Sequence, residues 1–362
     1  MKPSKNPSAL AAAGVDVISG VGRLADANSV SVDGSAIPAQ VVVLATGARP
    51  RVLPGSEPDG ERILTWEQVY GLPELPERLI VVGSGVTGAE FASAYRAMGC
   101  DVVLVSSRDR VLPGEDADAA AVLERAFARR GVEVRPHSRA AAVRRVGDRV
   151  DVTLADGAVL TGSHCLLAVG SVPNTDDLGL DRAGVATDGR GFITVDRVSR
   201  TSTPGIYAAG DCTGVLMLAS VAAMQGRIAM WHTLGQAVHP LDLRTVSSNV
   251  FTEPEIATVG WSQAVVDAGA INAEGVLLPL RTNARAKMQG FDDGFVKVFC
   301  RRGTRIVVGG VVVAPHASEL IHSLTMAVDQ RLTVDELAAT FTVYPSLSGS
   351  VAEAARQLHV TD

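Results

Sequence analysis

Short apolar runs of strand length alternate with longer stretches of helical periodicity through the middle of the chain. Five such segments follow one another as strand, helix, strand, helix and strand, and a glycine (Gly99 or Gly131) stands where each helix should end. In chain order the segments are Leu79–Val82, Val86–Met98, Val102–Val105, Ala117–Arg130 and Val132–Val134. This order predicts a doubly wound α/β unit with a parallel sheet.

Further segments extend this pattern on both sides. Before it, Val15–Ile18 and Val41–Leu44 are predicted strands. After it, alternating residues predict a β-meander, followed by two more apolar strands and a long helix. These later segments are Ala140–Arg145, Arg149–Leu154, Cys165–Val169, Ile206–Ala209 and Ala219–Leu234.

The character of the chain changes after about Arg244. Three predicted strands come first, and two predicted helices follow them. The segments are Val276–Leu280, Phe295–Cys300, Ile306–Val313, Ser318–Gln330 and Val334–Ala339. Strands followed by helices predict a separate α+β domain.

The composition is that of a globular protein that acts on small molecules. Of the 362 residues, 47% are hydrophobic and 20% are charged, and a formal net charge of −6 offers no basic surface for nucleic acid. The longest apolar run, Ile306–Ala314, is shorter than the ~20 residues that span a bilayer, and no signal peptide is recognisable. We therefore expect a cytoplasmic protein without a membrane span or a nucleic-acid partner.

The cysteines and histidines show no spacing typical of a metal site. The four cysteines lie far apart without a CxxC or CxxxxC pair, and the seven histidines are equally scattered. We expect no bound metal, and we expect the thiols to be free and buried. The cysteines are Cys100, Cys165, Cys212 and Cys300.

The segment between the first strand and helix of the α/β unit has the glycine spacing of a dinucleotide-binding turn. Gly83 permits the tight turn, Gly85 lets the backbone approach a pyrophosphate, and Gly88 lets helix and strand pack closely. The pyrophosphate of such a site lies at the helix N-terminus, here beside Val86 and Thr87. The turn therefore predicts an NAD(P) site.

The end of the second strand bears on the choice between NADH and NADPH. NAD sites place Asp or Glu there, whereas NADP sites replace the acid and add an arginine. By its spacing from Gly99, Ser106 occupies the acid position, and Arg108 can pair with a 2′-phosphate. Asp109 is the alternative ribose acid if the alignment is shifted. We expect NADPH as the donor, with NADH accepted as well.

Two further strand ends indicate a second dinucleotide. The residues Ala45, Thr46 and Gly47 follow one predicted strand, and Gly210 and Asp211 follow another. An aspartate at the carboxyl end of a strand can accept a hydrogen bond from a ribityl hydroxyl of a flavin. The order of these two signals around residues 83–88 favours an FAD site.

The chain resembles the flavoprotein disulfide reductases, which include dihydrolipoamide dehydrogenase, glutathione reductase and mercuric reductase. The matching segments are ATG at 45–47, VVGSGVTGAEFA at 81–92, AVGSVPN at 168–174, GIYAAGDC at 205–212 and TVYPSLSG at 342–349. The resemblance implies two Rossmann-like domains for FAD and NAD(P), an α+β dimerisation domain, and a homodimer. It also implies that Glu90 lies near the nicotinamide and that Gly170 belongs to the NAD(P) site. Leu218 and Ala219 are implied in the FAD site.

This resemblance divides the chain into four segments. Residues 1–70 correspond to a C-terminal remnant of the first half of the FAD domain, and residues 71–175 to the NAD(P)-binding domain. Residues 176–244 correspond to the second part of the FAD domain, and residues 245–362 to the dimerisation domain. The family begins with its own FAD fingerprint and a CxxxxC pair, and residues 1–50 contain neither. We therefore expect an FAD domain that is incomplete at its N-terminus.

The closing motif departs from the disulfide reducers at two positions. Tyr344 stands where these enzymes carry a catalytic His, and Gly349 stands where they carry the Glu that orients it. An imidazole exchanges protons with a thiol near neutral pH, whereas a phenol ordinarily titrates near pH ~10, so no catalytic residue is assigned. The closing motif and Leu280–Met288 are similar to the quinone-reducing, lipoamide-dehydrogenase-like branch of the family.

We therefore expect an FAD-dependent NAD(P)H oxidoreductase that passes electrons to a quinone-type acceptor and not to a disulfide. One alternative is a dihydrolipoamide dehydrogenase-like enzyme. Another is a non-catalytic fragment that binds NAD(P) but no FAD. Tyr344 can also be a packed interface aromatic without a part in catalysis.

Overall fold

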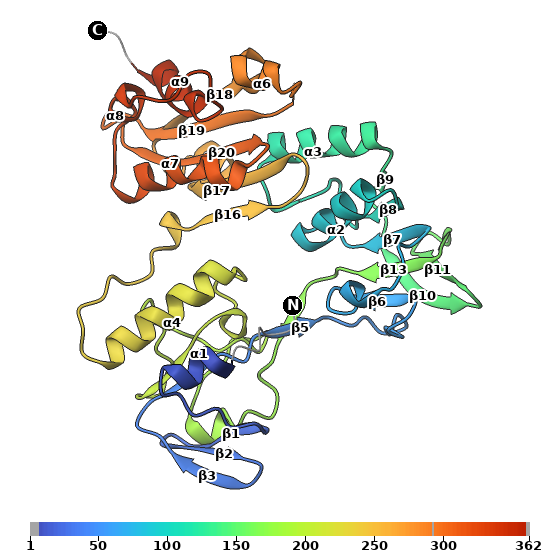
Figure 1. Ribbon diagram of the computed structural model, residues 1–362, viewed down its shortest axis with the longest axis vertical. Coiled ribbons are helices and arrows are strands. Elements are labelled where there is room, and N and C mark those ends of the chain that lie inside the picture. The colour runs from blue at the N-terminus through green and yellow to red at the C-terminus, as the bar shows by residue number, and fades with distance from the viewer. Residues whose placement is uncertain (1–6, 292, 360–362) are drawn as a thin grey trace. The chain divides into compact units, whose positions relative to one another are not determined.

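The computed structural model describes residues 7–291 and 293–359. The chain divides into two compact units, Met1–Arg49 with Ser171–Leu241 and Pro50–Gly170 with Asp242–Asp362. Both contain strands and helices, which confirms the α/β class (Figure 1). No helix among the described residues is long and apolar enough to cross a bilayer.

A parallel sheet forms the first part of the second unit (Figure 1). Its five strands lie in the order β6-β13-β7-β8-β9, and every neighbouring pair is parallel. Helix α2 connects β7 to β8 and helix α3 connects β8 to β9, as predicted. The elements are β6 (Ile63–Thr65), β7 (Arg78–Val82), α2 (Val86–Ala97), β8 (Asp101–Val105), α3 (Ala117–Arg130), β9 (Glu133–Arg135) and β13 (His164–Leu167).

The central strands are apolar after their first residues because both faces of the sheet are covered. On β7, Leu79 and Val81 pack in a cluster that includes Ala89 of α2 and Leu123 of α3. Ile80 points to the opposite face and packs in a cluster with the antiparallel meander. The meander consists of β10 (Ala140–Val146), β11 (Arg149–Leu154) and β12 (Val159–Gly162).

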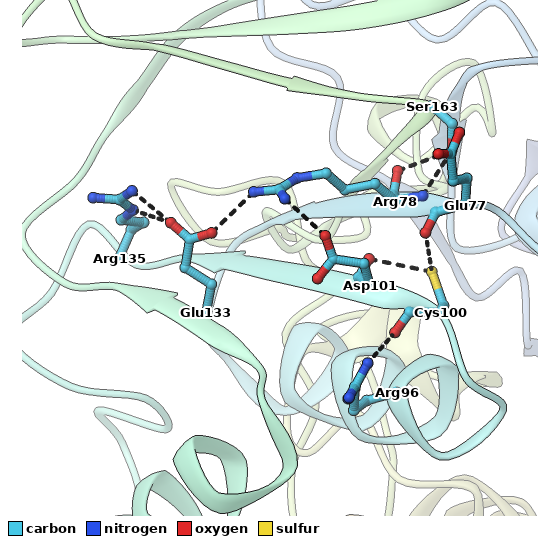
Figure 2. A network of polar contacts seen from close by, with 8 residues as sticks. All are labelled: Glu77, Arg78, Arg96, Cys100, Asp101, Glu133, Arg135 and Ser163. Atoms are coloured by element: carbon cyan, nitrogen blue, oxygen red, sulfur yellow. Dashed lines mark hydrogen bonds and ion pairs between the residues drawn. The ribbon is translucent and has the colours of Figure 1, made fainter.

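A polar network connects the amino ends of the parallel strands (Figure 2). The guanidinium of Arg78, at the start of β7, pairs with Asp101 at the start of β8 (2.7 Å) and with Glu133 at the start of β9 (2.9 Å). The Ser163 hydroxyl donates to the backbone carbonyl oxygen of Arg78 (3.0 Å) and thereby connects β7 to the residue before β13. The network fixes the strands at the edge opposite to their carboxyl ends.

An antiparallel sheet forms the second part of this unit. Its strand order is β16-β17-β20-β19-β18, with α7 packed on β17 and β20, and α9 packed on β18 and β19. Residues of β19 alternate between two cores: Val296 and Val298 pack with α7 and α9, whereas Phe295 and Phe299 pack in the cluster that contains Leu123 of α3. We call this antiparallel sheet the dimerisation-type sheet, and the parallel sheet with α2 and α3 the nucleotide-type domain. The two share one hydrophobic cluster. Its elements are β16 (Ser247–Val250), β17 (Glu255–Gly260), α5 (Gln263–Asp267), β18 (Ala273–Pro279), α6 (Ala284–Met288), β19 (Phe295–Arg301), β20 (Val307–Ala314), α7 (Ala317–Asp329), α8 (Val334–Ala339) and α9 (Gly349–Leu358).

The first unit is smaller and contains the expected second set of strand ends. Strand β4 (Val42–Leu44) pairs in parallel with β15 (Ile206–Ala208), and helix α4 (Ala219–Thr233) follows. An antiparallel meander precedes them. The remaining elements are α1 (Pro7–Ala12), β1 (Gly22–Asp26), β2 (Ser29–Val32) and β3 (Ser35–Pro38), with β5 (Ala48–Pro50) paired to β14 (Ser171–Pro173).

The strand predicted at Val15–Ile18 is wrong. These residues are exposed, and they lie outside every strand of the described chain. The apolar run has no neighbouring strand to bond with, and a strand is stable only in a sheet. The strands of this region are instead β1–β3, whose alternation at Ser29–Val32 and turn at Asp33-Gly34 are the signals we overlooked.

Candidate functional site

The turn between β7 and α2 is built on main-chain contacts that exclude side chains. A β-carbon at Gly88 would overlap the carbonyl oxygen of Gly83, and a β-carbon at Gly83 would overlap the carbonyl oxygen of Ala168. Gly83 also has a φ of +112°, which L side chains rarely adopt. Two of the three glycines are therefore explained by packing between the helix and the strands.

The third glycine is not explained by packing within the protein. A β-carbon at Gly85 would meet nothing within 4 Å, and Gly85 is the N-cap of α2 without a side-chain hydrogen bond to the helix. The first residues of the helix, Val86 and Thr87, are exposed. Open space in front of uncapped amides suits a pyrophosphate, so the turn fits the NAD(P) group that the sequence predicts.

The neighbouring strand ends lie at the same edge of the sheet. Gly170 follows β13 closely and is exposed, with its carbonyl oxygen accepting from the backbone amide of Arg51 (2.9 Å). Ser106 follows β8, and its hydroxyl lies 2.7 Å from the hydroxyl of Ser84 in the turn. The parallel order of β13, β7 and β8 therefore brings Gly170, Gly85 and the residues after Ser106 to one edge.

Ser106 itself is fully buried. Its hydroxyl lies within hydrogen-bond distance of the carbonyl oxygens of Arg108 (3.2 Å) and Arg110 (3.1 Å), in addition to Ser84. A buried hydroxyl with these partners is not free to bind a nucleotide. Ser106 would matter to a nucleotide only because it leaves no carboxylate at this position. The residues Ser107, Arg108 and Asp109 are exposed at the strand end and are the groups that a ribose could reach.

Glu90 lies one turn into α2 and is half-buried. One of its carboxylate oxygens accepts a hydrogen bond from the backbone amide of Phe251 (2.8 Å). Burial raises the pKa of the Glu90 carboxyl above its ordinary value, and the hydrogen bond from Phe251 opposes this shift. The structure thus places Glu90 on the helix that begins at the candidate pyrophosphate site, with its side chain held by the start of the dimerisation-type sheet.

In the first unit, two strand ends form the candidate flavin site. Thr46 and Gly47 follow β4, and Gly210 and Asp211 follow its parallel neighbour β15, with Leu44 opposite Ala208. Each of these loops is held by one amide side chain. Asn174 Nδ2 donates to the carbonyl oxygen of Thr46 (3.0 Å).

The second of these amides is Gln225 of α4, which is buried. Its Oε1 accepts the backbone amide of Gly210 (2.8 Å). We did not single out Asn174 or Gln225 from the sequence. The signal for Gln225 is a polar residue among apolar positions of a helix, which does not reveal its partner.

Polar groups at these strand ends lack hydrogen-bond partners among the residues that the structure describes. Thr46 Oγ1 is a buried side-chain oxygen without a hydrogen bond to any described residue. Asp211 is half-buried, no donor among the described residues reaches its carboxylate, and burial raises its pKa. Buried polar groups in native proteins are normally satisfied, so a hydroxyl-rich ligand such as the ribityl chain of FAD fits here.

The remaining predicted FAD residues lie on the same unit. Leu218 is the N-cap of α4 without a side-chain cap, and Ala219 is the first residue of that helix. Both follow the Gly210-Asp211 loop in the chain, and α4 packs on β15. Ala45 is exposed directly after β4.

The closing motif forms the loop between α8 and α9. Tyr344 is 85% exposed, and Gly349 is the first residue of α9, where a β-carbon would make only ordinary contacts at 3.5 Å. The neighbouring Phe341 and Val343 are exposed as well. Neither substitution relative to the family His and Glu is therefore forced by packing within this chain.

Each of the four cysteines belongs to a different hydrophobic cluster. Each is free and buried. Burial raises the pKa of the Cys100 thiol to about 11, and it raises the pKa of Cys165 and Cys300 as well. No group of three or more His, Cys, Asp or Glu side chains in the described residues is arranged to hold a metal ion.

Comparison with known families agrees with this geometry. Residues 4–226 match the pyridine nucleotide-disulphide oxidoreductases, and residues 246–355 match the dimerisation domain of the same proteins. The chain belongs to this family, which confirms the resemblance seen in its motifs. It is therefore an oxidoreductase of an FAD-dependent, NAD(P)H-using family, and its dimerisation domain indicates a homodimer.

Individual relatives cover nearly the whole chain. An NAD(P)H dehydrogenase (quinone) from Mycobacterium tuberculosis is 59% identical over 96% of this chain and 73% of its own length. A dihydrolipoyl dehydrogenase from Chlamydia trachomatis is 35% identical over 94% of this chain and 74% of its own length. Among solved structures, LpdA from Mycobacterium tuberculosis superposes with a TM-score of 0.93 at 58% identity, covering 98% of this chain and 80% of that one.

Two glycine substitutions in the β7–α2 turn separate ligand binding from folding. Gly85→Ala should cost about 1 kcal/mol of stability or less and lower Tm by only a few degrees, because the new methyl group meets no protein atom. Its methyl group enters the space proposed for the pyrophosphate, so NADP⁺ affinity should fall at least ~10-fold by calorimetry. Gly88→Ala should instead lower Tm strongly, because its methyl group overlaps Gly83. Unchanged affinity in Gly85→Ala would contradict the assignment.

Removing the unsatisfied carboxylate tests the flavin site. Asp211→Ala should leave Tm in the absence of FAD unchanged or raised, since a half-buried charge without a partner is lost. The same variant should retain much less FAD than the unchanged protein, measured by absorbance at about 450 nm after desalting. Asp181→Ala, at an exposed position of the same unit, is the matched control and should retain FAD normally. Equal retention by both variants would exclude Asp211 from the site.

Proposed function

We propose that this enzyme passes hydride from NAD(P)H by way of FAD to a quinone-type acceptor, and that it does not reduce disulfides. One observation carries the second half of this proposal: Tyr344 and Gly349 stand where the disulfide-reducing members carry His and Glu. A thiol-reducing site needs a group that titrates near neutral pH and a partner that orients it. The closing loop of this chain offers neither.

The four cysteines of this chain are themselves poorly suited to disulfide chemistry. Disulfide chemistry proceeds through a thiolate, and burial without a nearby base disfavours the thiolate. All four cysteines of the sequence are buried and free, and the thiol of Cys100 keeps its proton up to about pH 11. Free thiols are also typical of the reducing cytoplasm, which supports the expected location.

The protein's own residues would hold and orient the two cofactors. FAD, when bound, supplies the hydride and electron chemistry, so a protein acid–base pair is not required for that step. Thr46 offers an unsatisfied hydroxyl and Asp211 a half-buried carboxylate to FAD, and Gly85 with the start of α2 offers space and amides to the pyrophosphate of NAD(P)H. We assign residues 71–175 to NAD(P)H, and residues 1–70 and 176–244 to FAD.

The residues after β8 favour NADPH as the donor. Arg108 is exposed at the strand end, and Ser106 leaves no carboxylate there to repel a 2′-phosphate. Asp109 lies beside Arg108 and can accept from a ribose hydroxyl, so NADH is accepted as well. The name of the Mycobacterium tuberculosis relative, NAD(P)H dehydrogenase (quinone), supports both the donor and the acceptor class.

Dihydrolipoamide dehydrogenase is the second candidate activity, because relatives at 31–35% identity carry that name. Steady-state assays of the protein saturated with FAD distinguish the two. We expect NADPH-dependent reduction of a benzoquinone or naphthoquinone and no significant turnover of lipoamide. Lipoamide turnover without quinone reduction would contradict the proposal. FAD-free protein that binds NADP⁺ would instead support a non-catalytic NAD(P)-binding protein.

Arg108 gives a separate test of the donor. A charge-assisted hydrogen bond contributes about 1.5–3 kcal/mol, so Arg108→Gln should weaken NADPH binding ~10- to 100-fold. NADH binding should change much less, because NADH lacks the 2′-phosphate. Arg125→Gln, at an exposed position of α3, is the control and should change neither affinity. Equal losses for both nucleotides in Arg108→Gln would argue against recognition of the 2′-phosphate.

A further inference from the structure

A lysine of the dimerisation-type sheet is buried against the nucleotide-type domain. Lys297 lies on β19 between Phe295 and Phe299, on the face of the sheet that packs in the cluster with α3. Its side chain is only 3% exposed. A lysine is rarely buried to this degree without a charged partner, so its contacts should have a specific role.

The partners of Lys297 are two carboxylates at the start of α3. Its Nζ lies 2.7 Å from Asp116 Oδ2 and 2.8 Å from Asp118 Oδ2. The Asp116 side chain is 3% exposed, whereas that of Asp118 is 61% exposed. The Nζ group also lies 5.5 Å from the centre of the Phe295 ring. The pair with Asp116 is therefore the buried one.

Asp116 also caps helix α3 of the nucleotide-type domain. Its other oxygen, Oδ1, accepts the backbone amides of Asp118 (3.0 Å) and Ala119 (3.1 Å) and so caps α3. The two oxygens of one carboxylate thus join the first turn of α3 to a central strand of the other domain. Asp116 is therefore held both by the helix that it caps and by a strand of the other domain.

That loop, residues 106–116, carries Arg108. It begins at β8, where Ser106 bonds with Ser84. In the middle, the backbone amide of Leu112 donates to the carbonyl oxygen of Ser84 (2.8 Å), and that of Val111 donates to Glu124 Oε1 (2.8 Å). Its far end is Asp116. Both ends and the middle of the loop are therefore held, with Lys297 as the anchor contributed by the other domain.

We propose that Lys297 is a positioning residue for the loop of residues 106–116, which contacts the adenosine ribose of the bound nucleotide. Without its ammonium group, the Asp116 carboxylate would be a buried charge with no counter-ion, and this segment would have to move toward water. Such a movement shifts the end of the loop and, with it, Arg108. The inference rests on the proposed role of Arg108 in binding NADPH.

A double-mutant cycle tests this role. Lys297→Met leaves Asp116 unpaired, whereas Lys297→Met with Asp116→Asn leaves no buried charge and keeps a residue that can cap α3. Calorimetry with NADP⁺ and with NAD⁺ needs no turnover and no flavin. Lys297→Met should weaken NADP⁺ binding about 10-fold and NAD⁺ binding less than ~3-fold, and the double variant should recover most of the loss.

Amide hydrogen exchange of residues 107–112 gives a readout that does not depend on the donor. Exchange should be faster in Lys297→Met and near the original rate in the double variant. Arg130→Met is the control, because Arg130 pairs with Glu253 at the far end of α3 and should change neither loop exchange nor selectivity.

Two results would overturn the inference. In the first, Lys297→Met lowers Tm but leaves both the NADP⁺:NAD⁺ ratio and loop exchange unchanged. In the second, the double variant folds but recovers neither the original NADP⁺:NAD⁺ affinity ratio nor the original exchange rate of the loop. Should the unchanged protein bind both nucleotides equally, the proposed donor preference fails, and the exchange data still decide the role of Lys297.

Discussion

The close approach of α2 to β7 is the constraint on which the nucleotide site depends. At Gly88 the helix comes so near to the carbonyl oxygen of Gly83 that no side chain fits between them, and Gly83 is packed as closely against Ala168 after β13. This contact fixes the start of the helix at the carboxyl edge of the sheet and leaves its first amides uncapped. Gly85 then has open space in front of it, so the same contact that packs the fold creates a place for a pyrophosphate.

The other features of the site follow from the parallel order of the strands. Because β13, β7 and β8 run in one direction, Gly170, the glycine turn and the loop after Ser106 meet at one edge. The ion pairs of Arg78 lie at the opposite edge, where they hold register without approaching the site (Figure 2). The same rule places Thr46 and Asp211 together in the first unit, since β4 and β15 are parallel.

Many of the strands and helices could be predicted from the sequence because they depend on residues close together in the chain. The runs Leu79–Val82 and Ala117–Arg130 have the period and the ends of their elements, and the structure reproduces them within a residue. The strand predicted at Val15–Ile18 failed because an apolar run does not show whether a partner strand exists. The fold class and the family also followed from motifs whose order along the chain is itself informative.

What could not be predicted depends on contacts between distant residues. Gln225 supports Gly210 and Lys297 anchors Asp116, yet in the sequence each is only a polar residue within an apolar segment. The burial of Ser106 was likewise hidden, because its partner Ser84 lies on another strand end. Their contacts with the candidate site are visible only once the strands are side by side.

The central claim is that the four cysteines of this chain, all buried and free, take no part in the transfer of electrons from NADPH to the flavin. An anaerobic titration of the FAD-saturated protein with NADPH measures this most directly, because flavin and a disulfide each store two electrons. Full reduction should consume about two electrons per bound flavin. Uptake of about four electrons per flavin, or no reduction by NADPH at all, would contradict the claim.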